Sequence, residues 1–320
     1  MTGAIVREEI DVQSPLDQAN SAPPVPARPS GPTWLVTPGI APARFDTAVG
    51  SGAEVVLLDL EDSVPAGSKA DARAAVLAFA GARTRRSDGP LLGVRINAVG
   101  GAEGLRDLAA MDEERRWPDL IVVPKVESGR EIKAVVQATR GAPAPPKVWA
   151  LIESPQGVVR LPGIVHAQGL AGVLFGAADY AAAAGCQLTS RAMWYPRAQL
   201  VTEAAAAGIP AVDSPFFSLD DQDGLRRDAL EAVELGFTGK VAVHPRQLSV
   251  IAQAFAPSPR ELQAARAVLA AAASAAKAGG AVTTADGVMV GPPLVEAALA
   301  VVRRAGHRPA VTTTSVTKVS

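Results

Sequence analysis

Residues 54–62 read Glu-Val-Val-Leu-Leu-Asp-Leu-Glu-Asp, a short apolar run that ends in three carboxylates. Hydrophobicity in this run is nearly continuous rather than alternating, which is typical of a strand buried on both faces of a parallel sheet. Other runs along the chain have the same character. Together, the eight predicted strands are residues 34–37, 54–59, 91–97, 120–124, 148–153, 172–175, 209–213 and 240–244.

Longer alanine-rich stretches with helical spacing separate several of these strands. They predict helices at 69–82, 127–139, 195–207 and 224–235. Gly208 and Gly236 stand where the last two of these helices should stop. Regular alternation of strand and helix indicates an α/β fold with right-handed crossovers, and eight such units fit a TIM (β/α)₈ barrel.

An open doubly wound sheet is the structural alternative to the barrel. Such a sheet usually carries a glycine-rich phosphate-binding turn directly after a strand. The Gly-Ser-Gly sequence at 50–52 precedes a strand instead, so it does not serve as that turn. This absence favours the barrel.

The barrel is expected to occupy residues 31–258. Two further helices, at 260–277 and 292–304, exceed what a barrel needs, so residues 259–307 should form a C-terminal helical segment that covers the barrel or a neighbouring subunit. Residues 1–30 and 308–320 are expected to be disordered tails. The first of these tails lacks the basic start and apolar run of a signal peptide.

Composition excludes several classes of function. The 320 residues include 31 basic and 32 acidic side chains, and a net charge of −1 does not suit nucleic acid or an anionic membrane. No window approaches the roughly 18 uninterrupted apolar residues of a membrane span. A single cysteine, Cys186, excludes an intrachain disulfide framework and fits a reducing compartment, so we expect a cytoplasmic protein.

Reactive side chains follow the predicted strands at their C-terminal ends, where TIM barrels carry their active sites. They are Asp59, Glu61 and Asp62, then Arg95 and Asn97, Lys125 and Glu127, Glu153, Asp179, Asp213 and His244. Structural roles remain open for each of them, because acids favour helix N-termini and a lone histidine often makes only a structural contact. Arg95 needs a carboxylate partner in either case, since it lies in an apolar strand.

The chemistry of this set points to a hard cation. Two carboxylates from successive strands, with few histidines and no cysteine cluster, favour a divalent ion bound through oxygen, such as Mg²⁺. A nearby arginine would hold a substrate carboxylate by a two-pronged hydrogen bond. A metal beside an arginine suits a 2-oxo acid and stabilises oxygen charge while a carbon–carbon bond forms or breaks.

An ordered series of segments resembles the citrate lyase β-subunit-like branch of the HpcH/HpaI aldolase family. The matching segments are 58–64 (Leu-Asp-Leu-Glu-Asp-Ser-Val) with Lys69 and Arg73, 94–97, 124–127 (Pro-Lys-Val-Glu), 150–154, 175–180, 211–215, 236–240 and 243–247. They occur in the family's order and cover roughly residues 33–304. No single motif is decisive, but the ordered set is highly specific.

The resemblance implies a TIM-like barrel in trimers or hexamers, and a carbon–carbon lyase for hydroxyacyl-CoA thioesters such as malyl-CoA or citramalyl-CoA. It implies that Glu153 and Asp179 bind Mg²⁺, or Mn²⁺ in its place. Arg95 would hold the oxo-acid carboxylate, and Glu61 would orient water, metal or substrate. The other expected site residues are Asp59 in the catalytic set, and Lys125, Gly176, Ala177 and Ala178 against the substrate.

Three positions depart from the family pattern. Ser30-Gly31-Pro32-Thr33 replaces an Arg-Ser pair, and Ala178 stands where a carboxylate often precedes the metal aspartate. Gly291 stands where related CoA-ester lyases carry an aspartate that reaches a neighbour's active site and handles a substrate proton. Either another acid such as Asp286 replaces it, or the thioester half-reaction differs.

Two alternatives therefore accompany the lyase hypothesis. The chain could be an aldolase or condensing enzyme for a 2-oxo acid without CoA, or a non-catalytic subunit that keeps the barrel. Retention of Arg95 and the acidic pair argues against an inactive scaffold.

Overall fold

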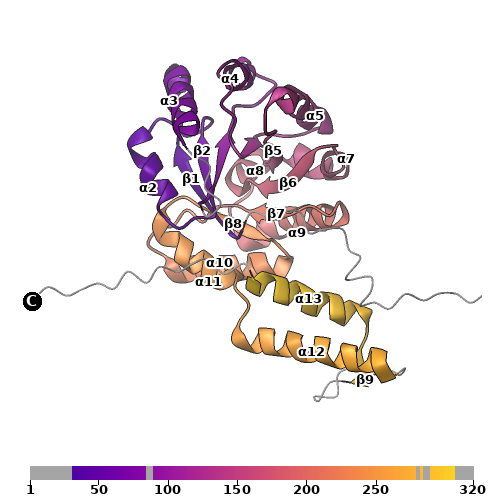
Figure 1. Ribbon diagram of the computed structural model, residues 1–320. Helices are drawn as coiled ribbons and strands as arrows, with labels where there is room; N and C mark the ends of the chain where they lie inside the picture. The colour runs from indigo at the N-terminus through magenta and orange to yellow at the C-terminus, as the bar shows by residue number, and fades with distance from the viewer. Residues whose placement is uncertain (1–30, 84–88, 279–281, 284–288, 307–320) are drawn as a thin grey trace, which may run out of the picture. The chain divides into compact units, whose positions relative to one another are not determined.

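A computed structural model of the chain describes residues 31–83, 89–278, 282–283 and 289–306. Within these residues, eight parallel strands close into a barrel in sequence order, with β8 beside β1 (Figure 1). The predicted TIM barrel is therefore confirmed. The strands are β1 (Thr33–Pro38), β2 (Val55–Asp59), β3 (Leu91–Arg95), β4 (Leu120–Val123), β5 (Lys147–Ile152), β6 (Leu170–Phe175), β7 (Ala211–Asp213) and β8 (Gly239–Ala242).

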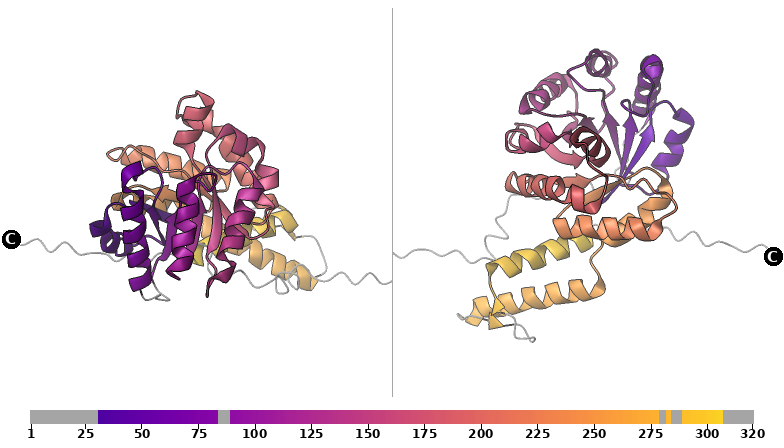
Figure 2. Two further views of the ribbon diagram at one scale, coloured as in Figure 1. Left: turned by 90° about the horizontal axis from the view of Figure 1, so that it is seen from above. Right: turned by 180° about the vertical axis from the view of Figure 1, so that it is seen from behind.

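Helices surround the strands of the barrel, as the views in Figures 1 and 2 agree. The α-helices are α2 (Phe45–Val49), α3 (Lys69–Ala82), α4 (Ala102–Glu113), α5 (Gly129–Ala138), α6 (Pro155–Val159), α7 (Leu161–Val165), α8 (Ala177–Ala184), α9 (Ser190–Ala206), α10 (Gln222–Leu235) and α11 (Leu248–Phe255). Short 3₁₀ turns are η1 (Pro42–Arg44), η2 (Ala66–Ser68), η3 (Thr139–Gly141) and η4 (Pro245–Gln247). Helix α3 has the predicted bounds.

Helix α9 begins five residues earlier than the predicted start at Tyr195. The Thr189 hydroxyl accepts a hydrogen bond from the backbone N–H of Ala192 at 3.3 Å, and this cap starts the helix. Pro196 then lies inside the helix, although proline is best tolerated in a first turn. The prediction placed the helix start next to this proline and was wrong there. The predicted stop at Gly208 is confirmed, with a left-handed φ of +68°.

Inward-facing side chains fill the barrel in a cluster separate from the one that packs strands against helices. Trp34 and Trp149 meet edge to face at its centre, with ring centroids 4.8 Å apart. Gly172 provides the space for this pair, because a Cβ there would lie 2.3 Å from the ring of Trp149. The inward cluster comprises Trp34, Val55, Leu57, Leu120, Val122, Trp149, Leu151, Leu174, Val212 and Val241.

A buried ion cluster joins the outside of the barrel to helices α9 and α10. Lys240 of β8 is fully buried, and its Nζ lies 2.6 Å from Asp213 Oδ2 and 2.5 Å from Asp228 Oδ2. Arg197 makes a two-pronged bond to Asp213 and an ion pair with Glu231 at 3.3 Å. Two cations and three carboxylates thus link two strands to two helices.

The described chain divides into two compact units, one ending at Phe255 and the other beginning at Ala256. The second unit pairs α12 (Pro259–Ala278) with α13 (Pro292–Gly306), beside a small antiparallel pair of strands, β9 (Val282–Thr283) and β10 (Met289–Val290). That these helices cover the barrel or a neighbour stays a prediction. The two predicted tails lie outside the described residues. Each described helix is too short or too polar to cross a membrane.

Asp213→Ala is expected to lower the free energy of unfolding by about 3–5 kcal/mol, because it removes a carboxylate that two buried cations share. Urea denaturation measures this loss. Asp220→Ala is the control, since the Asp220 side chain is 96% exposed and pairs with Arg246 at the surface. It should leave stability nearly unchanged. Equal losses in both variants would contradict a structural role for the buried cluster.

Candidate functional site

Three of the predicted site residues lie at the C-terminal mouth of the barrel, where their strands end. Side chains alternate along a strand, so Asp59 faces inward like Leu57 two residues before it. The same relation links Leu151 to Glu153. Arg95 is the register partner of Asp59 on the neighbouring strand β3. Closure of the barrel therefore brings these groups together.

Asp59 and Arg95 form a two-pronged ion pair. Arg95 Nε donates to Asp59 Oδ1 at 2.6 Å, and Arg95 Nη2 donates to Oδ2 at 2.8 Å. The backbone N–H groups of Glu61 and Ser63 donate to the same carboxylate at 2.9 and 3.1 Å. Burial alone would raise the pKa of Asp59, but the bonds from Arg95 outweigh it and hold the pKa below its usual value. Asp59 is therefore a fixed, fully buried anion.

The pair uses one edge of the Arg95 fork, and the other edge faces Glu61 and Asp62. A guanidinium group carries five N–H donors in one plane, and Asp59 uses the edge formed by Nε and Nη2. The outer edge is formed by Nη1 and Nη2. Nη1 lies 3.0 Å from Glu61 Oε2, a buried oxygen without an aligned hydrogen bond, and 3.5 Å from Asp62 Oδ2.

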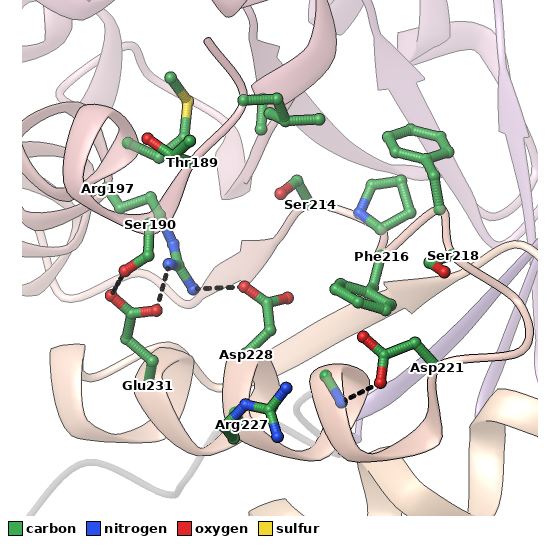
Figure 3. Close-up of a pocket in the computed structure, with 16 residues that line it drawn as sticks. Thr189, Ser190, Arg197, Ser214, Phe216, Ser218, Asp221, Arg227, Asp228 and Glu231 are labelled. Atoms are coloured by element: carbon green, nitrogen blue, oxygen red, sulfur yellow. Dashed lines mark hydrogen bonds and ion pairs between the residues drawn. The ribbon is translucent and has the colours of Figure 1, made fainter.

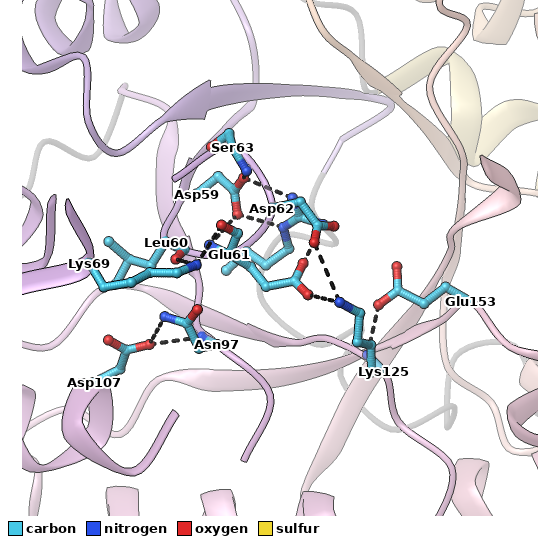
Figure 4. Close-up of polar contacts among 11 residues, drawn as sticks. Asp59, Leu60, Glu61, Asp62, Ser63, Lys69, Asn97, Asp107, Lys125 and Glu153 are labelled. Atoms are coloured by element: carbon cyan, nitrogen blue, oxygen red, sulfur yellow. Dashed lines mark hydrogen bonds and ion pairs between the residues drawn. The ribbon is translucent and has the colours of Figure 1, made fainter. Parts of the chain in front are cut away.

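Glu61 and Asp62 also meet the side chain of Lys125, as Figure 4 shows. Lys125 Nζ lies 2.5 Å from Glu61 Oε1 and 3.4 Å from Asp62 Oδ1. Burial raises the pKa of Glu61, against the lowering effect of Arg95 and Lys125. The hydrogen bond with Glu61 raises the pKa of Lys125, so this lysine stays protonated.

Glu153 is buried, with its carboxylate held from the adjacent loop. The backbone N–H of Lys125 donates to Glu153 Oε1 at 2.7 Å. Burial raises the pKa of Glu153 to about 8, and the negative charges of Glu61 and Asp179 add to this effect. Without a cation, the ionised carboxylate is therefore unfavourable at neutral pH.

Asp179 and the three small residues before it begin helix α8. Asp179 is exposed in the first turn, close enough to Glu153 for its charge to act on the pKa of that carboxyl group. Gly176 is the N-cap, and Ala177 and Ala178 are the first helical residues. N–H groups in a first turn have no acceptor within the helix, so they face outward as donors. Because α8 directly follows β6, Asp179, Gly176, Ala177 and Ala178 lie at the same C-terminal end of the barrel as Glu153.

Lys69 has a part in the site that sequence reasoning left without a role. Its Nζ donates to the backbone carbonyls of Leu60 and Glu61, at 2.8 and 2.7 Å (Figure 4). These two bonds fix the loop that carries Glu61. The signal in the sequence was the family match of Lys69 itself, but only the fold shows what its ammonium group contacts.

Other strand-end candidates have structural roles. Asn97 donates through its backbone N–H and its Nδ2 to Asp107 Oδ2, both at 2.8 Å, and Arg73 binds the other oxygen of Asp107. Asp213 belongs to the ion cluster outside the barrel. His244 caps turn η4, where its Nδ1 accepts from the N–H of Arg246.

The donor set at the mouth fits a hard cation that keeps water or substrate ligands. In the described part of the chain, no three histidine, cysteine, aspartate or glutamate side chains are arranged to hold a metal. Mg²⁺ does not require three, because one or two protein carboxylates suffice and other oxygens complete its octahedron. Glu153 is a buried carboxylate that a nearby cation would stabilise in its ionised form, and Asp179 is a second carboxylate close enough to affect its pKa. These two residues can hold such an ion.

A pocket of about 590 Å³ adjoins the mouth between α9, α10 and the loop after β7. Figure 3 shows Asp228 and Glu231 extending from α10 toward Arg197, with Ser214 and Phe216 on another wall. Of the predicted site residues, only Ala177 lines it. The pocket therefore borders the acidic mouth at the end of β6, but it does not coincide with it.

Comparison with known proteins gives relatives over most of the chain. A citrate lyase subunit beta-like protein from Mycobacterium tuberculosis is 34% identical over 287 residues, covering 88% of this chain and 97% of that protein. An L-malyl-CoA/beta-methylmalyl-CoA lyase from Cereibacter sphaeroides is 32% identical over 310 residues, covering 88% of this chain and 96% of the lyase.

Solved structures agree with these relatives. CitE from Mycobacterium tuberculosis, in complex with magnesium, acetoacetate and coenzyme A, has a TM-score of 0.72 and 33% identity, covering 88% of this chain and 100% of that one. RipC from Yersinia pestis has a TM-score of 0.63 and 34% identity, covering 72% of this chain and 98% of that one. The family model HpcH/HpaI aldolase/citrate lyase matches residues 33–245. The chain therefore belongs to the HpcH/HpaI aldolase/citrate lyase family.

Proposed function

We propose that the protein is a Mg²⁺-dependent carbon–carbon lyase that cleaves or forms a β-hydroxyacyl-CoA thioester such as malyl-CoA or citramalyl-CoA. The observation that carries this proposal is the buried carboxylate of Glu153, whose pKa is affected by the charges of Arg95 and Asp179. Relatives named as a citrate lyase beta-like protein and a malyl-CoA lyase support the reaction class. A CitE structure that holds magnesium and coenzyme A supports the cofactor and the thioester.

Glu153 and Asp179 would hold Mg²⁺, or Mn²⁺ in its place, and the bound cation would stabilise negative charge developing on a substrate oxygen. The outer edge of Arg95 would bind the carboxylate of the 2-oxo acid portion in place of its present contacts with Glu61 and Asp62. Asp59 does not touch the substrate in this scheme and acts as the positioning residue of Arg95. Glu61, held by Lys125, orients the reacting hydroxyl or a water molecule.

In the cleavage direction, the substrate hydroxyl passes its proton to Glu61 or to the water that Glu61 orients, and the carbon–carbon bond beside it breaks. A 2-oxo acid such as glyoxylate leaves, while the electrons of the broken bond form the thioester enolate, which takes up a proton to give the acyl-CoA product. The backbone N–H groups of Ala177 and Ala178 supply further donors for its oxygens. The pocket lined by Ala177 offers space for a part of the substrate that extends beyond the acidic mouth.

Gly291 favours a second candidate, an aldolase or condensing enzyme for a 2-oxo acid without CoA. A glycine cannot transfer the proton that the corresponding aspartate of related lyases is expected to handle. Asp286, the other acid considered for this step, lies outside the described residues. The two candidates share the metal and the arginine and differ only in the thioester half of the substrate.

We further propose that the chain works in the cytoplasm as a homo-oligomer, a trimer or a hexamer. The family resemblance supports the oligomer, and the lone, exposed Cys186 is compatible with a reducing compartment. Analytical ultracentrifugation of the full chain would give the number of subunits.

Glu153→Gln is expected to reduce Mg²⁺-dependent turnover of malyl-CoA or citramalyl-CoA by about 10³-fold, because metal stabilisation of the oxyanion contributes several kcal/mol. Release of glyoxylate or pyruvate measures the rate, with free 4-hydroxy-2-oxo acids assayed in parallel. Glu131→Gln is the control, since glutamine preserves its capping role at helix α5. Full activity of Glu153→Gln would contradict the assignment, and turnover of the free acids alone would favour the second candidate.

Mg²⁺ binding is expected to release close to one proton below pH 8. Burial raises the pKa of Glu153 to about 8, so the carboxyl group is mostly neutral at pH 7 and must ionise to bind a cation. Affinity should therefore rise up to about tenfold per pH unit below pH 8 and level off above it. Calorimetry in buffers of different ionisation enthalpy counts the proton. A constant affinity from pH 6 to 9 would refute this coupling.

Gly291→Asp tests the thioester half of the reaction. A Cβ at this position would meet nothing closer than Pro293 Cδ at 3.8 Å, and aspartate is favoured where a helix begins, here α13. If a missing acid limits thioester turnover, the variant should raise kcat/KM by up to about 100-fold. Gly291→Asn has the same shape without a transferable proton and should give no gain. Equal rates for both variants would exclude a limiting proton transfer at this position.

A further inference from the structure

The backbone of Lys125 adopts a conformation that L-residues rarely take. Its φ is +54°, in the left-handed region where a Cβ approaches the following carbonyl oxygen. Glycine and asparagine adopt this region more easily than lysine does. Among the described non-glycine residues, only Arg115 has a similar φ, also +54°. Such residues concentrate at functional sites, where the surrounding structure imposes them.

The left-handed turn at Lys125 directs its N–H away from the sheet and onto a side chain. The strand before it, β4, ends at Val123, and the next backbone bond to β5 is from the N–H of Val126 to the carbonyl of Leu151. Between these two points, the N–H of Lys125 donates to Glu153 Oε1 at 2.7 Å. One carboxylate oxygen of Glu153 is therefore held by a backbone donor from the neighbouring strand end.

Gly176 bounds the same carboxylate from the other side. A Cβ at this position would lie 2.5 Å from Glu153 Cβ and 2.7 Å from Glu153 Oε2. Because φ of Gly176 is −108°, any residue tolerates its backbone, and glycine is needed there for space alone. The ends of β4 and β6 thus confine the one side chain that projects between them from the end of β5.

The ammonium group of Lys125 points elsewhere, toward Glu61 and Asp62. The contact with Glu153 uses only its backbone. The positive charge of Lys125 is therefore separable from the geometry that Lys125 gives to Glu153.

We infer that Lys125, through its left-handed backbone, and Gly176, through its missing side chain, are positioning residues that orient the Glu153 carboxylate for the divalent cation. This inference rests on the proposed function, because it takes Glu153 as a ligand of Mg²⁺. It assigns to two residues a role in cation affinity that does not involve contact with the cation.

Mg²⁺ titration calorimetry on the full chain at pH 8, without substrate, tests the inference. Lys125→Gly and Lys125→Asn should bind Mg²⁺ within about threefold of the wild type or more tightly, since both residues accept a positive φ and a repelling charge is lost. Lys125→Val and Gly176→Ala should bind about 10–100-fold more weakly, as substitutions that disturb the support of a metal ligand do. Lys125→Ala serves in place of the valine variant if the latter does not fold.

Arg115→Val is the matched control, because it introduces the same backbone strain at φ +54°. Arg115 follows helix α4, and its guanidinium group donates to the carbonyl of Gly141. Its variant should lower the melting temperature as Lys125→Val does, but leave Mg²⁺ affinity unchanged.

The outcomes separate the two proposals. If the wild type binds no Mg²⁺, the proposed metal site fails and this inference fails with it. If the wild type binds Mg²⁺ and Lys125→Val and Gly176→Ala bind it equally well, only the inference is overturned. It is also overturned if Lys125→Gly loses as much affinity as Lys125→Val, because the side chain would then be responsible.

Discussion

The buried ion pair between Asp59 and Arg95 organises the mouth of the barrel. Strands β2 and β3 place the two residues opposite each other in register, and neither charge is stable there alone. Their two-pronged bond fixes the plane of the guanidinium group, and that plane determines which edge meets Glu61 and Asp62. Lys125 then connects Glu61 to Glu153. The acidic site is thus arranged around an arginine that one carboxylate already holds.

The eight strands could be predicted because strands in a closed parallel barrel are buried on both faces. This produces continuous apolar runs such as Leu120–Val123, which the sequence displays directly. Helix α3 has a clear period between its flanking turns, and its predicted bounds are the observed ones. Helix α9 was less predictable, because Pro196 lies inside it and the threonine that caps it stands seven residues earlier. The apolar pattern indicates the helix there, while the Thr189 cap decides where it begins.

The acids and the arginine of the site could be predicted from their position at strand ends, but their partners could not. Asp59 and Glu61 are two residues apart in one motif, yet Asp59 holds Arg95 by a two-pronged ion pair, whereas Glu61 contacts Lys125. Likewise, Asp213 ends a strand as Asp59 does, but it faces outward into an ion cluster with Lys240. Whether a side chain faces into or out of the barrel depends on its place in the alternation along the strand. The positive φ of Lys125 cannot be recognised from the residue types around it. These features require coordinates.

The two indole rings at the centre of the barrel restrict the directions from which ions and substrate can reach Glu153. Trp34 and Trp149 are 0% and 2% exposed and contact each other edge to face, so they pack the barrel interior below the acids. Glu153 lies four residues beyond Trp149 on the same inward-facing row. Packed apolar side chains thus fill the interior below the acids. Ions and substrate must therefore approach Glu153 from the mouth of the barrel and not through its interior.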